Sequence, residues 1–182
     1  MCAGPSLASV MSGKSGSRSI SPSGLAVVAI VVIVAFLLYL HVAYGLQAVV
    51  VDGISMLPTL QSGDVVFIVH VNPTDINVGD VIVYRFTGNF YGIYLSNALI
   101  IHRVIYKYYY NGVLCFVTKG DNNPLPDPGY PSLCGTVDAN GTEVSGIPYY
   151  YVYGVVVGGS QPLVIPYVGG LSLMFNPSSV QP

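Results

Sequence analysis

The stretch LAVVAIVVIVAFLLYL, residues 25–40, contains no polar side chain except the phenol of Tyr39. The apolar character continues to Leu46, and no formally charged residue occurs within residues 19–51. A helix needs roughly 20 mainly apolar residues to cross the hydrocarbon core of a bilayer. The sequence therefore predicts a transmembrane helix at residues 24–46.

The charges beside this helix predict its orientation. Lys14 and Arg18 are the only charged residues before it, and basic residues favour the cytoplasmic side of a membrane. Residues 1–23, rich in Ser and Gly, are expected to form a flexible cytoplasmic tail, and residues 47–182 then lie outside. A cleaved signal peptide has an apolar region of only about 7–15 residues. A retained anchor is therefore favoured over an exported protein whose mature chain begins near residues 44–50.

The composition limits the partners of the chain. Of its 182 residues, 52% are hydrophobic and 8% are charged, against about 25% charged residues in average globular domains. The 6 Lys and Arg residues form no basic run, so no nucleic-acid partner is predicted. The apolar content also excludes a disordered chain. We expect a protein of the cell membrane, with the lipid bilayer as one of its partners.

Beyond the anchor, the sequence consists of short β-rich runs separated by turn residues. Asn111-Gly112 lies between two such runs and is a strong signal for a β-hairpin. No window after residue 46 keeps a helical period of apolar residues. The predicted fold is mainly β, with a single N-terminal transmembrane helix and an all-β domain at 47–182. The expected strands cover residues 65–71, 81–86, 92–110, 113–118 and 149–157.

Two features of the outer domain leave alternatives open. The apolar segment 163–175 is interrupted by Pro166, and it fits either a membrane-interface segment or a core strand. Cys115 and Cys134 both fall on the outer side, where a disulfide can persist. Two buried free thiols are an equal alternative, because sequence does not reveal the geometry that a disulfide needs.

The candidate catalytic residues are few in a chain so poor in charge. Ser55 lies between Gly53 and a Pro-containing turn, His102 lies in an apolar run, and Asp121 and Asp127 follow close to one another. Each has an ordinary structural explanation, since Ser and Asp are common in turns and a lone His is commonly a core residue. Together they supply the nucleophile, base and orienting acid of acyl transfer.

Metal and cofactor chemistry is not predicted. The His residues at 41, 70 and 102 are scattered along the chain. The sequence holds no HExxH, no CxxC and no phosphate-binding glycine loop, which are the short motifs that carry such chemistry.

Four short motifs occur in a fixed order, and each of them alone would be weak evidence. They are SMLPT at 55–59, GDVIVY at 79–84, IHRVI at 101–105 and KGDNN at 119–123. Their order and the upstream anchor resemble the type I signal peptidases over roughly residues 25–175. His102 stands where bacterial members have Lys, which resembles the archaeal and endoplasmic-reticulum type with a Ser–His–Asp site.

The resemblance implies a role for each candidate residue. Ser55 is the expected nucleophile and His102 the general base. Asp127 is the first choice for the acid that orients the imidazole, and Asp121 is the second. The Ser55 backbone N–H is the expected oxyanion donor. Gly53 replaces a Ser that adds a hydroxyl donor in many bacterial members, and a glycine there lets the substrate approach closely.

The resemblance thus implies a membrane-bound serine endopeptidase that removes signal peptides from exported pre-proteins without a cofactor. Its partners would be those pre-proteins, the lipid bilayer and the protein translocation channel. Two alternatives stay open. One is a Ser/Lys processing peptidase that uses Lys107 or Lys119, and the other is a non-catalytic β module anchored in the membrane.

Overall fold

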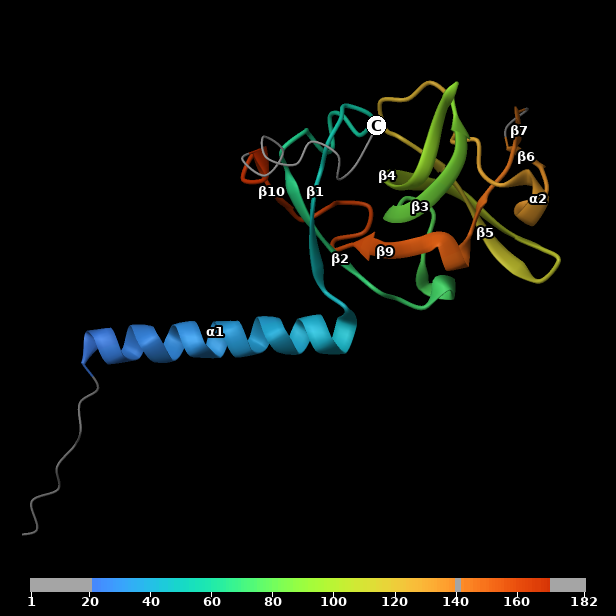
Figure 1. Cartoon of the computed structure of the whole chain (residues 1–182). Helices are drawn as coiled ribbons and strands as arrows, with labels where there is room; N and C mark the ends of the chain where they lie inside the picture. The colour runs from blue at the N-terminus through green and yellow to red at the C-terminus, as the bar shows by residue number, and fades with distance from the viewer. Residues whose placement is uncertain (1–20, 140–141, 171–182) are drawn as a thin grey trace, which may run out of the picture. The chain divides into compact units, whose positions relative to one another are not determined.

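The computed structural model describes residues 21–139 and 142–170. Helix α1, Pro22–Tyr44, is long and apolar enough to cross a membrane, with a mean hydropathy of 3.0 in its best window. None of its side chains is buried, as expected of a helix whose apolar surface faces lipid. Of the predicted tail at 1–23, residues 1–20 lie outside the described residues, and α1 already begins at Pro22. An N-terminal apolar helix before a β domain was predicted, and this arrangement is confirmed (Figure 1).

One sheet of eight strands dominates the β domain, in the order β1-β2-β9-β3-β4-β5-β8, with β10 also paired to β2. A second, two-stranded sheet pairs β6 with β7. The strands are β1 Gln47–Val50, β2 Val65–Val69, β3 Val81–Phe90, β4 Ile93–Tyr110, β5 Val113–Lys119, β6 Val137–Ala139, β7 Thr142–Val144, β8 Ile147–Pro148, β9 Val152–Val156 and β10 Val164–Ile165.

The long strands β3, β4 and β5 lie side by side at the centre of the large sheet. Side chains on successive residues of a strand point to opposite faces, and both faces of these strands are packed. One core contains Ile82, Ile100 and Phe116, and the other contains Val81, Val83 and Ile101. A site built on the buried middle parts of these strands therefore rests on a rigid support.

Several predicted boundaries can be compared with the observed ones. Asn111 and Gly112, with φ of 49° and 81°, form the predicted turn between β4 and β5. The prediction of a strand over 149–157 is partly wrong, because Tyr149–Tyr151 forms a 3-10 turn before β9. Residues 120–148, where no strand was expected, contain the short helix α2, Pro131–Cys134, and strands β6 to β8.

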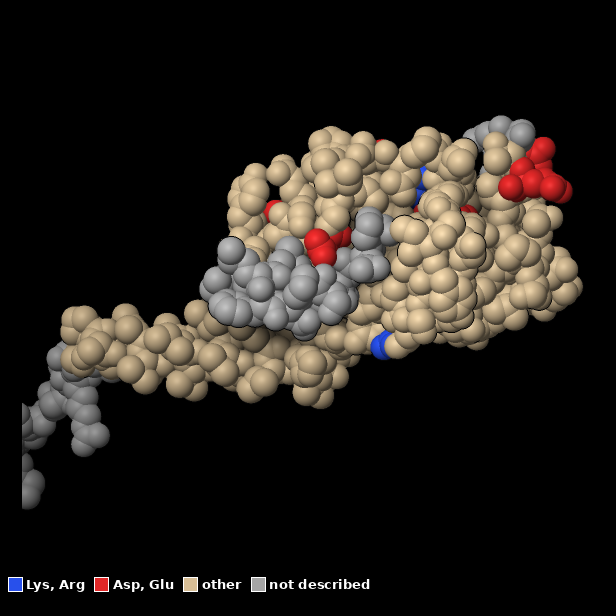
Figure 2. Space-filling model, turned by 45° about the horizontal axis from the view of Figure 1, so that its top comes forward, with Lys and Arg blue, Asp and Glu red and all other residues tan. Residues whose placement is uncertain are grey.

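The sequence left two questions open in the outer domain, the state of its two cysteines and the nature of the segment 163–175. Cys115 on β5 and Cys134 in α2 form a disulfide. Val164 and Ile165 pair with β2 as a short strand, whereas residues 171–175 lie outside the described part of the chain. On the face seen in Figure 2, charged side chains cover only small areas, and uncharged residues make up nearly all of the surface.

Candidate active site

Ser55 lies in the turn segment between β1 and β2. Met56 and Leu60, which follow Ser55 in the chain, are buried in the core, and they fix the segment to the sheet. Gly53 has a φ of 102°, a left-handed conformation that favours glycine. The Ser55 side chain is 9% exposed, so its hydroxyl is held in one place beside the surface.

His102 lies in the middle of β4, opposite Ile82 of β3 in the strand register. Its imidazole is fully buried, on the same face of the strand as Ile100. A buried imidazole needs partners for both ring nitrogens, and both have one.

Ser55, His102 and Asp127 form a continuous chain of hydrogen bonds. His102 Nε2 lies 3.0 Å from Ser55 Oγ, and His102 Nδ1 lies 2.7 Å from Asp127 Oδ2. With the proton on Nδ1, the ring donates to the carboxylate and accepts from the serine hydroxyl. This is the geometry in which a base activates a hydroxyl nucleophile while a third group orients the base.

Asp127 comes from the loop after β5 and is held by two further side chains. Its backbone N–H donates to Thr118 O at 2.8 Å. Its Oδ2 atom accepts hydrogen bonds from Tyr84 Oη at 2.7 Å and from Thr118 Oγ1 at 2.6 Å. Burial and the Asp127 carboxylate raise the pKa of Tyr84 well above its ordinary value, so the phenol remains a hydrogen-bond donor.

Sequence reasoning missed both Tyr84 and Thr118. A signal for them exists in the strand alternation, because Tyr84 shares a strand face with Ile82, and Thr118 shares one with Phe116. The same face of β4 carries His102.

Asp121 lies elsewhere in the site. Its carboxylate accepts from Arg103 Nε at 2.8 Å, from Arg103 Nη2 at 2.7 Å and from Thr59 Oγ1 at 2.5 Å. Burial raises the pKa of Asp121, but the hydrogen bonds from Arg103 and Thr59 outweigh it, so the pKa lies below its ordinary value. Asp121 therefore ties the Ser55 turn to β4 as half of an ion pair, whereas Asp127 contacts the imidazole.

The two lysines considered for a Ser/Lys site bond to backbone oxygens. Lys107 Nζ donates to Ile76 O at 2.7 Å, and Lys119 Nζ donates to Asn123 O at 2.9 Å. Within residues 21–139 and 142–170, no group of three or more His, Cys, Asp or Glu side chains is placed to hold a metal ion.

Gly120 is a third residue whose role sequence reasoning missed. A Cβ atom at this position would lie 2.6 Å from Ser55 O and 2.9 Å from His102 Nε2. Distances this short leave no room for a side chain, so the close approach of the loop to the Ser55–His102 pair requires glycine.

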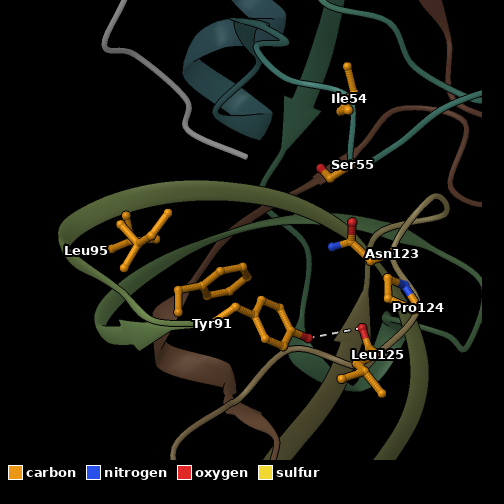
Figure 3. Close-up of a pocket in the computed structure, with 9 residues that line it drawn as sticks. Ile54, Ser55, Tyr91, Leu95, Asn123, Pro124 and Leu125 are labelled. Atoms are coloured by element: carbon orange, nitrogen blue, oxygen red, sulfur yellow. Dashed lines mark hydrogen bonds between the residues drawn. The ribbon is translucent and has the colours of Figure 1, made fainter.

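A cavity of about 290 Å³ opens beside Ser55 (Figure 3). Its wall includes Ile54, Phe90, Ile93, Leu95 and Leu125, with Asn123 next to Ser55. Tyr91 closes one side, and its hydroxyl donates to Leu125 O at 3.1 Å and also to Pro126 O. Burial and the Asp127 carboxylate raise the pKa of Tyr91 to about 12. The cavity offers a largely apolar space next to a hydroxyl group.

The sequence of this chain matches known proteins in the part that holds Ser55 and His102. Residues 24–105 match the family described as signal peptidase, peptidase S26. The signal peptidase complex catalytic subunit SEC11 of Scheffersomyces stipitis is 36% identical over 81 residues, which cover 44% of this chain and 43% of that protein. SEC11C of Homo sapiens is 35% identical over 82 residues, covering 44% of this chain and 38% of that subunit.

A longer match covers most of the chain. An uncharacterized protein of Methanocaldococcus jannaschii is 28% identical over 196 residues, which cover 78% of this chain and 86% of that protein. The chain spans less than half of the length of the two SEC11 relatives. With an apolar helix, a β domain and these matches, the chain is similar to the signal peptidase family over residues 24–105. Its named relatives are of the endoplasmic-reticulum type, as the sequence motifs predicted.

Proposed function

We propose that this chain is a membrane-anchored serine endopeptidase that cleaves N-terminal signal peptides from exported pre-proteins. The family match supports signal-peptide cleavage in general terms. The observation that carries the finer proposal is the chain of hydrogen bonds from Ser55 Oγ through His102 to Asp127, at 3.0 and 2.7 Å.

In the proposed acylation step, Ser55 Oγ attacks the carbonyl carbon of the scissile peptide bond. His102 Nε2 takes the hydroxyl proton, and the Asp127 carboxylate stabilises the imidazolium that forms. The tetrahedral intermediate then breaks its C–N bond, and His102 gives the proton to the leaving amine. An ester joins the signal peptide to Ser55, and the mature chain departs with a free amino terminus.

Deacylation repeats these proton transfers with water as the nucleophile. His102 takes a proton from the water that attacks the ester carbon, and it returns the proton to Ser55 Oγ as the C–O bond breaks. The negative charge of each tetrahedral intermediate requires a donor, and we assign the Ser55 backbone N–H to this role. Gly53 keeps the approach to it free of a side chain.

The cavity next to Ser55 supports the substrate proposal. Its apolar wall, with Leu95 and Leu125, suits the small apolar side chains at the −1 and −3 positions of signal peptides. At about 290 Å³ it is also small for a ligand site. An extended pre-protein segment would pass Ser55 with its side chains placed alternately into this space.

Helix α1 supports an anchor in the cell membrane, because its 23 residues are mainly apolar and include no Lys, Arg, Asp or Glu. Lys14 and Arg18 favour a cytoplasmic N-terminus and an extracytoplasmic β domain, and the Cys115–Cys134 disulfide is typical of that compartment. Since Ser55 follows soon after the end of α1 at Tyr44, it would face substrates close to the bilayer surface. The translocation channel that delivers pre-proteins is a proposed neighbour.

Cleavage of a test pre-protein in liposomes is the decisive experiment. Ser55→Ala, His102→Ala and Asp127→Ala are expected to lower kcat by at least about 10³-fold. Asp121→Ala is expected to keep measurable activity, because its carboxylate contacts Arg103 and not His102. Retained cleavage by Ser55→Ala would exclude the proposed enzyme. Retained cleavage by His102→Ala would instead favour a Ser/Lys mechanism.

A further inference from the structure

We propose that Tyr84 and Thr118 are positioning residues that hold the Asp127 carboxylate in the orientation His102 requires. This inference rests on the proposed function, since it concerns the same site. It adds two side chains that touch neither Ser55 nor the substrate cavity, and it assigns each of them a measurable effect on the proton transfers at His102.

The strand register brings the donors together on one face of the sheet. Tyr84 on β3, His102 on β4 and Thr118 on β5 occupy three neighbouring strands, with Ile82 opposite His102 and Val104 opposite Thr118. All three are essentially inaccessible, with exposures of 0%, 0% and 1%. Rigid strands therefore fix the donor atoms, whereas the acceptor comes from a loop.

The three donors converge on a single oxygen. Asp127 Oδ2 accepts from Tyr84 Oη at 2.7 Å, Thr118 Oγ1 at 2.6 Å and His102 Nδ1 at 2.7 Å. Oδ1 is buried and has no hydrogen-bond partner among the described residues. The hydrogen bonds that hold this buried anion are thus concentrated on the oxygen that faces the imidazole, and two of the three come from Tyr84 and Thr118.

The alternative is that the two hydroxyls only satisfy their own hydrogen-bonding needs in a buried place. That alternative predicts a loss of stability when a hydroxyl is removed, but no change in how the site titrates. The positioning role predicts more, because hydrogen bonds to a carboxylate favour its charged form. For the His102–Asp127 pair, these hydrogen bonds therefore favour the state with an ionised carboxylate and a neutral imidazole over the state with one more proton.

Removal of either donor should therefore move the acid limb of the kcat profile to higher pH. A hydrogen bond to a charged group corresponds to a shift of roughly one pH unit. Among the described residues, Tyr91, after β3, interacts electrostatically with Asp127, and Asp121, after β5, interacts with His102. The pKa of Tyr91 is about 12 and that of Asp121 is lowered, so neither titrates near neutral pH.

The experiment compares the full chain in liposomes with the variants Tyr84→Phe, Thr118→Val and Thr118→Ser. Tyr84→Phe removes only the hydroxyl, and Thr118→Ser keeps the donor and provides the rescue. Tyr153→Phe is the matched control, because its hydroxyl donates to Gln47 Oε1 at 2.7 Å in another part of the sheet. The measurements are kcat, KM, the pH dependence of kcat, and the temperature of unfolding.

We expect Tyr84→Phe and Thr118→Val to lower kcat about tenfold each with KM little changed, and to move the acid limb upward by roughly one unit. Thr118→Ser and Tyr153→Phe should match the wild type in kcat and in the position of the acid limb. An unchanged kcat and acid limb in Tyr84→Phe and Thr118→Val would overturn the inference, whatever happens to stability. If Tyr84→Phe does not fold, the comparison of Thr118→Val with Thr118→Ser gives the same decision.

Asp127→Asn separates this inference from the proposed function. An inactive Asp127→Asn together with wild-type behaviour of Tyr84→Phe and Thr118→Val would leave the proposed triad intact and remove only the positioning role. A fully active Asp127→Asn would overturn the triad itself.

Discussion

Arg103 and Asp121 form a two-point ion pair beside His102, with Arg103 Nε 2.8 Å from Oδ1 and Nη2 2.7 Å from Oδ2 of the carboxylate. The same guanidinium donates to Gly79 O at 2.7 Å and Ser160 O at 3.0 Å. Thr59 in the Ser55 turn completes the arrangement by donating to Asp121. A single side chain next to His102 in β4 therefore joins four separate segments around the site.

Substitution of Arg103 by Met should lower activity more than it lowers binding. Loss of the ion pair frees the loop at Asp121 and the turn that carries Ser55, and a displacement of about 1 Å can cost roughly 100-fold in rate. Arg85→Met is the matched control, since Arg85 contacts the exposed Asn97 and the Tyr153 ring. Kinetics on a test pre-protein should show a reduced kcat for Arg103→Met alone, and equal kcat values in the two variants would contradict this role.

The Arg103–Asp121 pair also predicts how stability depends on pH. The pKa of Asp121 is lower in the folded chain than in the unfolded one. The ionised Asp121 therefore makes its full contribution to the free energy of unfolding above the ordinary Asp pKa of about 3.9. The contribution is lost as the pH falls through the lower, folded pKa. The stability difference between wild type and Asp121→Asn should therefore be constant from pH 7 to about 5 and should shrink at lower pH.

Thermal unfolding in detergent over this pH range tests the Asp121 prediction. Asp52→Asn provides the baseline, because within residues 21–139 and 142–170 the Asp52 carboxylate accepts a hydrogen bond only from the exposed Ser62, at 3.2 Å. If the stability difference between wild type and Asp121→Asn grew as the pH fell, the ionised carboxylate would be destabilised by folding. The pKa of Asp121 would then be raised in the folded chain, which would contradict the prediction.

Much of the fold could be predicted from the sequence because its signals are local. The anchor and the hairpin at Asn111-Gly112 each depend on a few adjacent residues, and the structure contains both. The strand expected at Tyr149–Tyr151 failed for a physical reason. The preference of Tyr for strands reflects packing on a half-buried pleated surface, but Tyr149 and Tyr150 are 42% and 49% exposed.

The candidate site was predictable in its polar residues but not in their contacts. His102, Asp121 and Asp127 stood out because histidines and acidic residues are scarce in this chain, and Ser55 stood out because it lies between Gly53 and a Pro-containing turn. The bond between Tyr84 and Asp127 joins residues 43 positions apart, and it depends on the register of β3 against β4. Pairing of this kind is a property of the assembled sheet. The alternation within a strand predicts which face Tyr84 lies on, but not which residue it contacts there.

The disulfide makes a prediction for protein taken directly from membranes. Cys115 and Cys134 are both fully buried and joined, so a maleimide should label neither of them in the denatured, unreduced chain. Reduction should add two labels by mass spectrometry. Labels on Cys115 and Cys134 without reduction, in addition to the label on the third cysteine, Cys2, would contradict an extracytoplasmic, oxidised domain.

Loss of the disulfide should also destabilise the domain. The bridge closes a loop of 19 residues, for which the expected stabilisation is about 3 kcal/mol. The double variant Cys115→Ala, Cys134→Ala should unfold at a lower temperature than wild type and should not respond to a reductant. An unchanged unfolding temperature would show that α2 is held to β5 by packing alone.

Gly120→Ala tests whether close packing of the loop maintains the Ser55–His102 contact. The added methyl would lie 2.6 Å from Ser55 O, 2.8 Å from Asn123 Nδ2 and 2.9 Å from His102 Nε2, so the turn and the imidazole must separate to admit it. We expect kcat to fall by roughly 100-fold, with a smaller effect on KM. Gly170→Ala is the control, because a Cβ there meets no atom of the described residues within 4 Å. Its kcat should equal that of wild type. If Gly120→Ala cleaves a test pre-protein at the wild-type rate, the 3.0 Å contact between Ser55 and His102 does not depend on this glycine.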